Sequence, residues 1–150
     1  MIAILVFFIG LIQNSPGWKY ADPSVLCSLD SVCASTEGTD GNPSTPLVIG
    51  NIDFDIFPCE LSRVTVSVEC AVSEPVVLFI NLHNEQGGLL QSAVGYATPI
   101  NGSVTVEYTD PVFSAKLLRD DFTVHITAVP IGDYSFGISI DYFGISAVPF

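Results

Sequence analysis

Nearly half (49%) of the 150 residues are hydrophobic and only 13% are charged, so the chain is long and apolar enough to fold as one domain and is not a disordered tail. The chain has sixteen acidic residues and only four basic ones. The resulting net charge of −12 excludes binding to nucleic acid and to anionic membrane surfaces. Few lysines among many Ser, Thr, Val and Gly residues favour an extracellular or cell-surface protein.

An unbroken apolar run, Ile2–Ile12, opens the chain. Eleven residues of helix reach about 16 Å, too short for a ~30 Å hydrocarbon core, so no stable membrane span is expected. A secretion signal is one interpretation, although the basic start of a signal is missing. The other is a retained β-strand that fills its own core or a neighbour's. In that case the subunit-interface residues are the large apolar ones: Ile2, Ile4, Leu5, Val6, Phe7, Phe8, Ile9 and Leu11.

Composition divides the chain into an apolar segment (1–17), a second stretch (18–46) and a folded domain (47–150). The second stretch is dense in Ser, Thr, Gly, Asp and Pro, which favour turns, so it is predicted to be a linker or loop. Trp18 is expected to lie outside the folded domain. The domain itself alternates apolar and polar residues.

This alternation has the period of two that is typical of half-buried strands, and turn residues recur about every ten positions. An antiparallel, all-β sandwich is therefore predicted. Asn101-Gly102 is predicted to be a hairpin turn, because both positions of such a turn need positive φ. The predicted strands cover residues 52–57, 62–70, 75–83, 89–97, 103–108, 121–129 and 132–143.

The segments PIGDYSFGISIDYF and INLHNEQGGLL resemble the closing strand and the central hairpin of immunoglobulin-like modules of secreted and surface proteins. The resemblance covers roughly residues 47–149. It implies an adhesive or structural role and transfers no site residue. The expected fold is thus an immunoglobulin-like or jelly-roll-like sandwich. Type IV pilins are similar in joining an apolar N-terminus to a β-rich head, although their longer apolar helix is missing here.

The even number of cysteines fits an oxidising compartment. The disulfide candidates are Cys27, Cys33, Cys59 and Cys70. Cys59 and Cys70 bracket a predicted strand and are too far apart to bond unless the chain doubles back. A local Cys27–Cys33 bridge is the simplest pairing, and two long-range bridges are the alternative.

No motif for a catalytic nucleophile, a zinc protease or a phosphate-binding loop is present, so no catalytic residue, metal or cofactor is expected. The two histidines, His83 and His125, are predicted to be structural, and they meet only if their strands pair. Asn101-Gly102-Ser103 is a glycosylation sequon, which makes Asn101 a candidate acceptor.

These observations predict a non-enzymatic structural subunit of an extracellular, filament- or pilus-like assembly. Its partners are other copies of itself and other cell-surface components, and it polymerises through the apolar N-terminal segment. Two alternatives stay open. One is a secreted monomeric adhesion or binding module, and the other is a viral capsid or spike sandwich.

Overall fold

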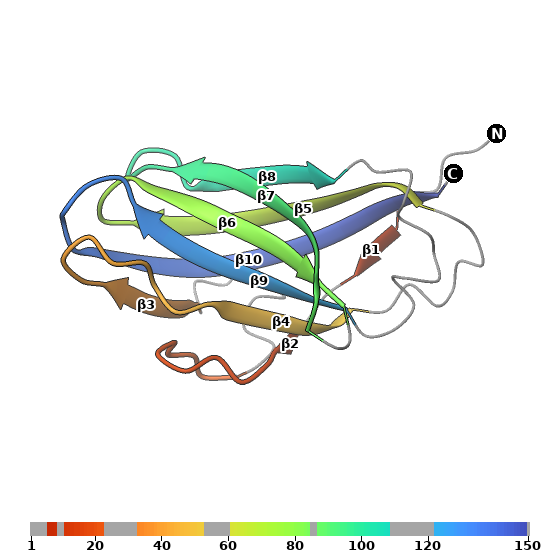
Figure 1. Cartoon of the computed structure of the whole chain (residues 1–150), viewed down its shortest axis with the longest axis horizontal. Helices are drawn as coiled ribbons and strands as arrows, with labels where there is room; N and C mark the ends of the chain where they lie inside the picture. Colours follow the sequence, from red (N-terminus) through yellow and green to blue (C-terminus); the bar gives the residue numbers. More distant parts are fainter. Residues whose placement is uncertain are drawn as a thin grey trace.

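The computed structural model describes residues 6–8, 11–22, 33–52, 61–84, 87–108 and 122–149, and these form two facing antiparallel sheets (Figure 1). No described helix is long and apolar enough to cross a membrane. The strands are β1 (Val6–Phe8), β2 (Leu11–Ile12), β3 (Ala34–Gly38), β4 (Leu47–Ile52), β5 (Leu61–Val72), β6 (Val76–His83), β7 (Leu89–Ala97), β8 (Ser103–Tyr108), β9 (Phe122–Pro130) and β10 (Phe136–Pro149).

The strand order confirms the predicted all-β sandwich and makes it a jelly roll. One sheet, which we call sheet A, has the order β1-β10-β5-β8, and β3 also pairs with β10. The other, sheet B, has the order β2-β4-β9-β6-β7. From β3 onward every link between consecutive strands crosses from one sheet to the other, except the β6–β7 hairpin. The eight strands from β3 to β10 therefore form the double sheet of a jelly roll.

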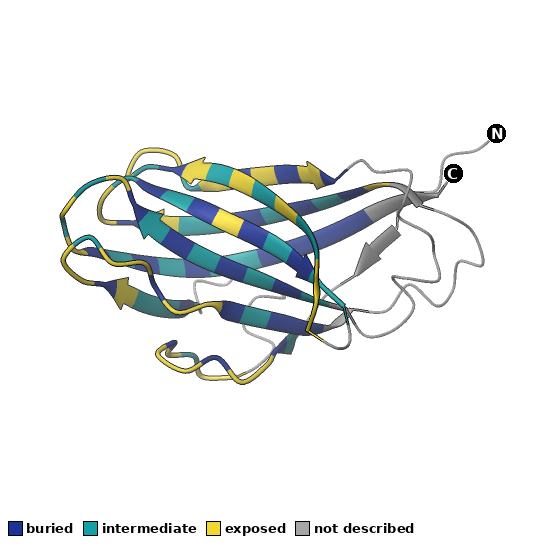
Figure 2. Ribbon diagram, in the orientation of Figure 1, coloured by how far each residue is buried: buried dark blue, intermediate teal, exposed yellow. Residues whose placement is uncertain are grey.

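The core lies between the sheets and is built from every second residue of the long strands. Seven inward side chains on β5 and β6 are no more than 1% exposed: Val64, Val66, Val68, Val76, Leu78, Ile80 and Leu82. The buried hydroxyl of Tyr108 on β8 donates a hydrogen bond to the carbonyl oxygen of Ile80 on β6, which joins the two sheets. The bands of buried and exposed residues in Figure 2 follow this alternation.

The stretch 18–46, predicted to be a linker, contributes a strand to the sandwich. β3 pairs with the first half of β10, and Ala34 is fully buried. Strand pairing uses only backbone groups, so the polar side chains of this stretch do not prevent it. The sheets therefore begin well before residue 47.

Trp18 is part of the packed structure, so the expectation that it lies outside is wrong. Its side chain is only 7% exposed. The indole Nε1 donates a hydrogen bond to the carbonyl oxygen of Thr45 at 2.8 Å, which satisfies the one polar group of the ring.

The described part of the apolar N-terminal run pairs within its own chain. β1 lies beside the end of β10, with Phe7 opposite Ser146, and β2 pairs with β4. Ile12 is 5% exposed and belongs to the core. Of the predicted interface residues, Ile2, Ile4, Leu5 and Ile9 lie outside the described residues, so the assignment of an intersubunit interface stays a prediction.

The predicted Asn101-Gly102 hairpin is wrong, because β7 and β8 belong to different sheets. Neither residue has positive φ. The link is instead closed by mutual backbone hydrogen bonds between Thr98 and Asn101. Gly102 is needed for a close approach, since a Cβ atom placed on it would lie 1.6 Å from the carbonyl oxygen of Cys70.

The substitution Gly102→Ala is expected to lower the free energy of unfolding by about 1–3 kcal/mol, because strand β5 or the link must move to make room. Urea denaturation followed by tryptophan fluorescence measures this. Gly137→Ala is the matched control, since the only atom within 4 Å of its added Cβ is the Ser73 hydroxyl oxygen at 3.9 Å. Equal stability of the two variants would contradict the argument.

Candidate functional site

The two sheets differ sharply in charge. The five strands of sheet B contain no Asp, Glu, Lys or Arg. Strands of sheet A carry five charged residues: Glu37, Arg63, Glu69, Glu107 and Asp141. The strongly acidic character of the chain is therefore absent from sheet B, which suits a neutral ligand.

The outward side of strands β6, β7 and β9 forms a continuous surface, which we call the sheet B face. Because the even-numbered residues of β6 fill the core, its odd-numbered residues point outward. The pairings Phe79–Val94 and Asn81–His125 place neighbours from β7 and β9 beside them. The face comprises Val77, Phe79, Asn81, His83, Leu89, Ser92, Val94, Tyr96, Thr123, His125, Thr127 and Val129.

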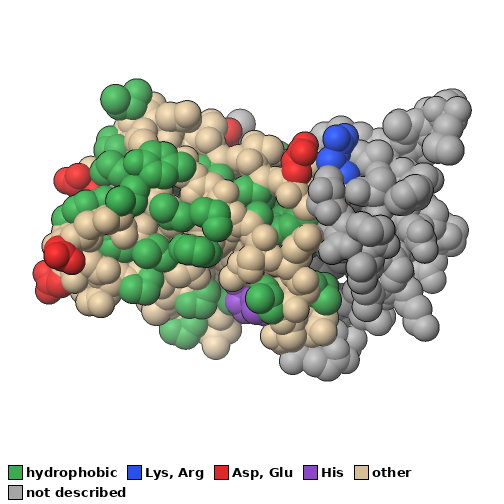
Figure 3. Space-filling view, turned by 45° about the horizontal axis from the view of Figure 1, so that its top comes forward, with side chains coloured by type: hydrophobic (Ala, Val, Ile, Leu, Met, Phe, Trp, Pro, Cys, Tyr) green, Lys and Arg blue, Asp and Glu red, His purple; other side chains and the backbone are tan. Residues whose placement is uncertain are grey.

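One half of the sheet B face is apolar and exposed. Phe79 is 38% exposed, and Val94 and Tyr96 are each 58% exposed. These three are half of the six large hydrophobic residues that are exposed in the described part of the chain, so the exposure is concentrated here. In Figure 3 hydrophobic side chains gather on one face, while acidic side chains lie at its margins. Adjacent exposed apolar side chains of this kind make the patch a candidate interaction surface.

The other half of the sheet B face, which we call its polar half, contains both histidines, and one exposed apolar residue, Leu89, lies opposite His83. The pairing of β6 with β9 places Asn81 opposite His125, and His83 opposite Thr123. The two imidazole rings lie with their centroids 3.9 Å apart and their planes tilted by 32°. The condition for the histidines to meet is thus fulfilled, and His125 faces away from the core as its strand pattern predicts.

Hydrogen bonds hold both imidazoles. Nδ1 of His83 lies 3.1 Å from the carbonyl oxygen of Gly87, and Nε2 of His125 lies 3.1 Å from the Thr123 hydroxyl. Burial, and then the neighbouring His83, lower the pKa of His125 below its ordinary value.

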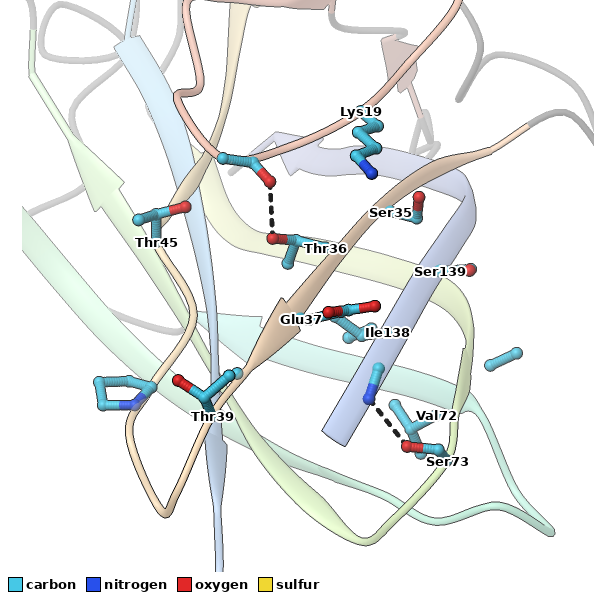
Figure 4. A pocket seen from close by; sticks show the side chains of 15 residues that line it. Lys19, Ser35, Thr36, Glu37, Thr39, Thr45, Val72, Ser73, Ile138 and Ser139 are labelled. Atoms are coloured by element: carbon cyan, nitrogen blue, oxygen red, sulfur yellow. Dashed lines mark hydrogen bonds between the residues drawn. The ribbon is translucent and has the colours of Figure 1, made fainter. Parts of the chain in front are cut away.

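A second candidate is an open hollow of about 730 Å³ on sheet A, around β3, β10 and the end of β5 (Figure 4). Hydroxyl groups line much of it, and Lys19 and Glu37 are its charged residues. Two local hydrogen bonds shape its wall, from the Thr36 hydroxyl to the Gly17 carbonyl and from the Gly137 amide to the Ser73 hydroxyl, each 2.8 Å long. None of its lining residues is aromatic.

The structure describes two of the four cysteines, Cys33 and Cys70. Cys33 and Cys70 are free thiols, so the structure forms neither the predicted Cys27–Cys33 bridge nor the alternative of two bridges, which would use all four cysteines. Cys27 and Cys59 lie outside the described residues. Burial, with smaller contributions from Glu69 and Asp141, raises the pKa of Cys70 to about 11, which keeps it protonated and unreactive at neutral pH.

The predicted glycosylation acceptor, Asn101, is exposed on the link between β7 and β8. Its Oδ1 accepts a hydrogen bond from the amide of Ser103 at 3.1 Å. Glycosylation of this residue stays a prediction.

Comparison with known proteins identifies a fold. No model of a known protein family matches the sequence, and no curated protein matches it. Among solved structures, "CBM4 structure and function" has a TM-score of 0.57 and 12% identity, covering 87% of this chain and 94% of that one. The "xylan-binding module CBM15" has a TM-score of 0.54 and 15% identity, with 97% of each chain covered.

A third solved structure, the CBM22-1 xylan-binding domain of Paenibacillus barcinonensis Xyn10C, has a TM-score of 0.52 and 13% identity. It is covered over 96% of its length, and 97% of this chain is covered. CBM denotes a carbohydrate-binding module. The chain therefore shares the β-sandwich fold of these modules, over nearly the whole of their length, and not specifically that of pilins or immunoglobulins.

The sheet B face was missed in the sequence, although a signal for it exists. Strand 76–83 is apolar on both faces over most of its length, which predicts burial on both sides. Phe79 is nevertheless exposed, because no element covers the outer side of β6 among the described residues. The neighbouring strand 89–97 also lacks charged residues, which is a second indication of an uncharged surface in the sequence.

Replacing His83 by Asn is expected to raise the pKa of His125 toward its ordinary value of 6.5, because the repulsive neighbour is gone while burial remains. Titration of the ring resonances by NMR measures the shift. The neutral form of His125 is favoured in the folded state, so the stability it contributes is present above pH 6.5 and is lost as the pH falls below it. An unchanged His125 pKa in the variant would show that the two rings do not interact.

Proposed function

We propose that the protein is a secreted, non-catalytic module that binds neutral polysaccharide on the apolar half of the sheet B face. The observation that carries the proposal is the exposure of Phe79 and Tyr96 on an uncharged sheet. The β-sandwich fold shared with carbohydrate-binding modules supports it. This function belongs to the binding-module alternative considered from the sequence.

The chemistry of a sugar ring matches this surface. A pyranose has an apolar C–H face and a rim of hydroxyl groups, and the electron-rich face of an aromatic ring attracts the C–H face. Phe79 and Tyr96 provide such rings. Ser92 and Thr127, on the neighbouring strands of the same face, provide hydrogen-bonding groups for the hydroxyl rim.

The shape and charge of the face indicate an extended, neutral ligand. The outward residues of β6 run from Val77 to His83, which spans about 20 Å at the rise of a strand. An open surface of this length accommodates several sugar units side by side. Polysaccharides that carry uronate or sulfate groups are disfavoured by the net charge of −12.

The hollow on sheet A supports sugar binding less well. Its hydroxyl groups can bind polar ligands, but its lining provides no aromatic ring for stacking. Water competes effectively for hydrogen bonds at an open, polar surface. The apolar half of the sheet B face offers burial of hydrophobic area in addition.

The filament hypothesis lacks comparable support. A donor-strand mechanism requires the N-terminal run to leave its own sandwich. The described residues of that run pair with β10 and β4 of the same chain, and Ile12 is buried there. The solved structures of similar fold favour binding of a carbohydrate over polymerisation.

Affinity gel electrophoresis against xylan, β-glucan, galactan and a polyuronate tests the proposal. We expect at least one neutral polysaccharide to retard the protein, and the polyuronate to leave its mobility unchanged. Tyr96→Ala is expected to weaken binding about tenfold or more, which corresponds to about 1.4 kcal/mol of lost binding free energy. Phe79→Ala should act in the same direction.

Tyr142→Ala is the matched control, because it removes the same ring from β10 of sheet A and should leave affinity unchanged. Absence of retardation by every neutral polysaccharide would overturn the proposed function. Loss of binding in the Tyr142 variant, with none in the Tyr96 variant, would move the site to sheet A.

A further inference from the structure

We propose that Asn81, His83 and His125, on the polar half of the sheet B face, form a binding site for a divalent transition-metal ion such as Zn²⁺, Ni²⁺ or Cu²⁺. The site does not depend on the proposed binding of sugars. It rests on three side chains that the β6–β9 pairing brings together on the outer side of one sheet, with Asn81 directly opposite His125 and His83 two residues further along β6.

His83 presents a defined lone pair. Its Nδ1 lies 3.1 Å from the carbonyl oxygen of Gly87, and a carbonyl oxygen only accepts hydrogen bonds. Nδ1 therefore carries the proton, and Nε2 of the neutral ring is the nitrogen that can bind a metal. A backbone carbonyl that fixes the tautomer of a histidine in this way is the usual support of a metal ligand.

His125 is supported in a similar way. Its Nε2 lies 3.1 Å from the Thr123 hydroxyl, which can accept the Nε2 proton and leave the Nδ1 lone pair for an ion. Neutral imidazole is the form that binds metals.

Asn81 supplies the independent observation that points to a ligand. Its Oδ1 is inaccessible to solvent and has no hydrogen-bond partner. A buried acceptor without a partner costs free energy and needs an explanation. A cation bound beside the two imidazoles provides one, because the amide oxygen then acts as a ligand.

The donor set decides which ions fit. Two imidazole nitrogens and one amide oxygen suit Zn²⁺, Ni²⁺ and Cu²⁺, whereas Ca²⁺ and Mg²⁺ prefer several oxygen ligands. Among the described residues no group of three or more His, Cys, Asp and Glu side chains could hold a metal ion, so the third donor in the proposed site is an amide oxygen. The ring planes are tilted by 32°, so both rings must turn from their present hydrogen-bonded positions before their lone pairs converge on one ion. Their half-exposed positions permit this.

Isothermal titration of the full chain with Ni²⁺ and with Zn²⁺ at pH 7.5 tests the site. We expect saturable binding of one ion, and at least a tenfold loss of affinity in His83→Asn and in His125→Asn. Asn81→Ala should weaken binding to a smaller extent. Long-range ¹⁵N correlation spectra identify the bound nitrogens, and they should show shifts at Nε2 of His83 and Nδ1 of His125.

Tyr96→Ala is the control, since it lies in the apolar half and should leave metal affinity unchanged, whatever its effect on sugar binding. Amide spectra of each histidine variant report whether it is folded. Undiminished binding in the double variant His83→Asn/His125→Asn would overturn the proposal. The proposal would also be overturned if Zn²⁺ left the ¹⁵N chemical shifts of both imidazoles unchanged in the unaltered protein. If the unaltered protein binds metal but no neutral polysaccharide, only the proposed function is overturned.

Discussion

The packing of β-branched and aromatic side chains between two sheets is the interaction on which the whole molecule depends. The inward residues of β5 and β6 lose essentially all solvent contact, and burial of each such side chain contributes roughly 1.5–3 kcal/mol. The Tyr108 hydroxyl bridges this layer to the Ile80 carbonyl, so its one polar group is satisfied inside the core. Every link between consecutive strands either crosses from one sheet to the other or joins the β6–β7 hairpin, so the described strands are all connected around this layer.

A core of this kind places few constraints on the residues that point outward, and the outer surfaces of the two sheets differ in charge. Sheet A carries charged side chains and a polar hollow, whereas sheet B is uncharged along all of its strands. On sheet B the pairings align an apolar half around Phe79 and Tyr96 with a polar half around Asn81 and the histidines. Two kinds of ligand chemistry thus lie side by side on one rigid surface, and the strand register sets the spacing between them.

Much of the fold was readable from local patterns. The alternation near Val64–Cys70 and Phe136–Ile140 predicts strands with one buried face. The structure confirms both strands and the burial of most of their predicted inward residues. The strand at 34–38 was missed because its side chains are polar and its pairing depends on the distant β10. The Asn101-Gly102 link was misread because a dipeptide cannot report that its flanking strands belong to different sheets. The site was hidden for the same reason, since His83 and His125 become neighbours only through the pairing of β6 with β9.

The position of β7 at the margin of sheet B has a consequence for colloidal behaviour. This edge strand of nine residues has neither a charge nor a proline, two of the devices that stop strands of separate molecules from joining edge to edge. The acidic residues elsewhere on the chain oppose such joining, because like charges on two molecules repel each other over about 10 Å in ordinary buffers. Concentrated salt or acid weakens this repulsion, because it screens or neutralises charges that lie far from the exposed edge of β7.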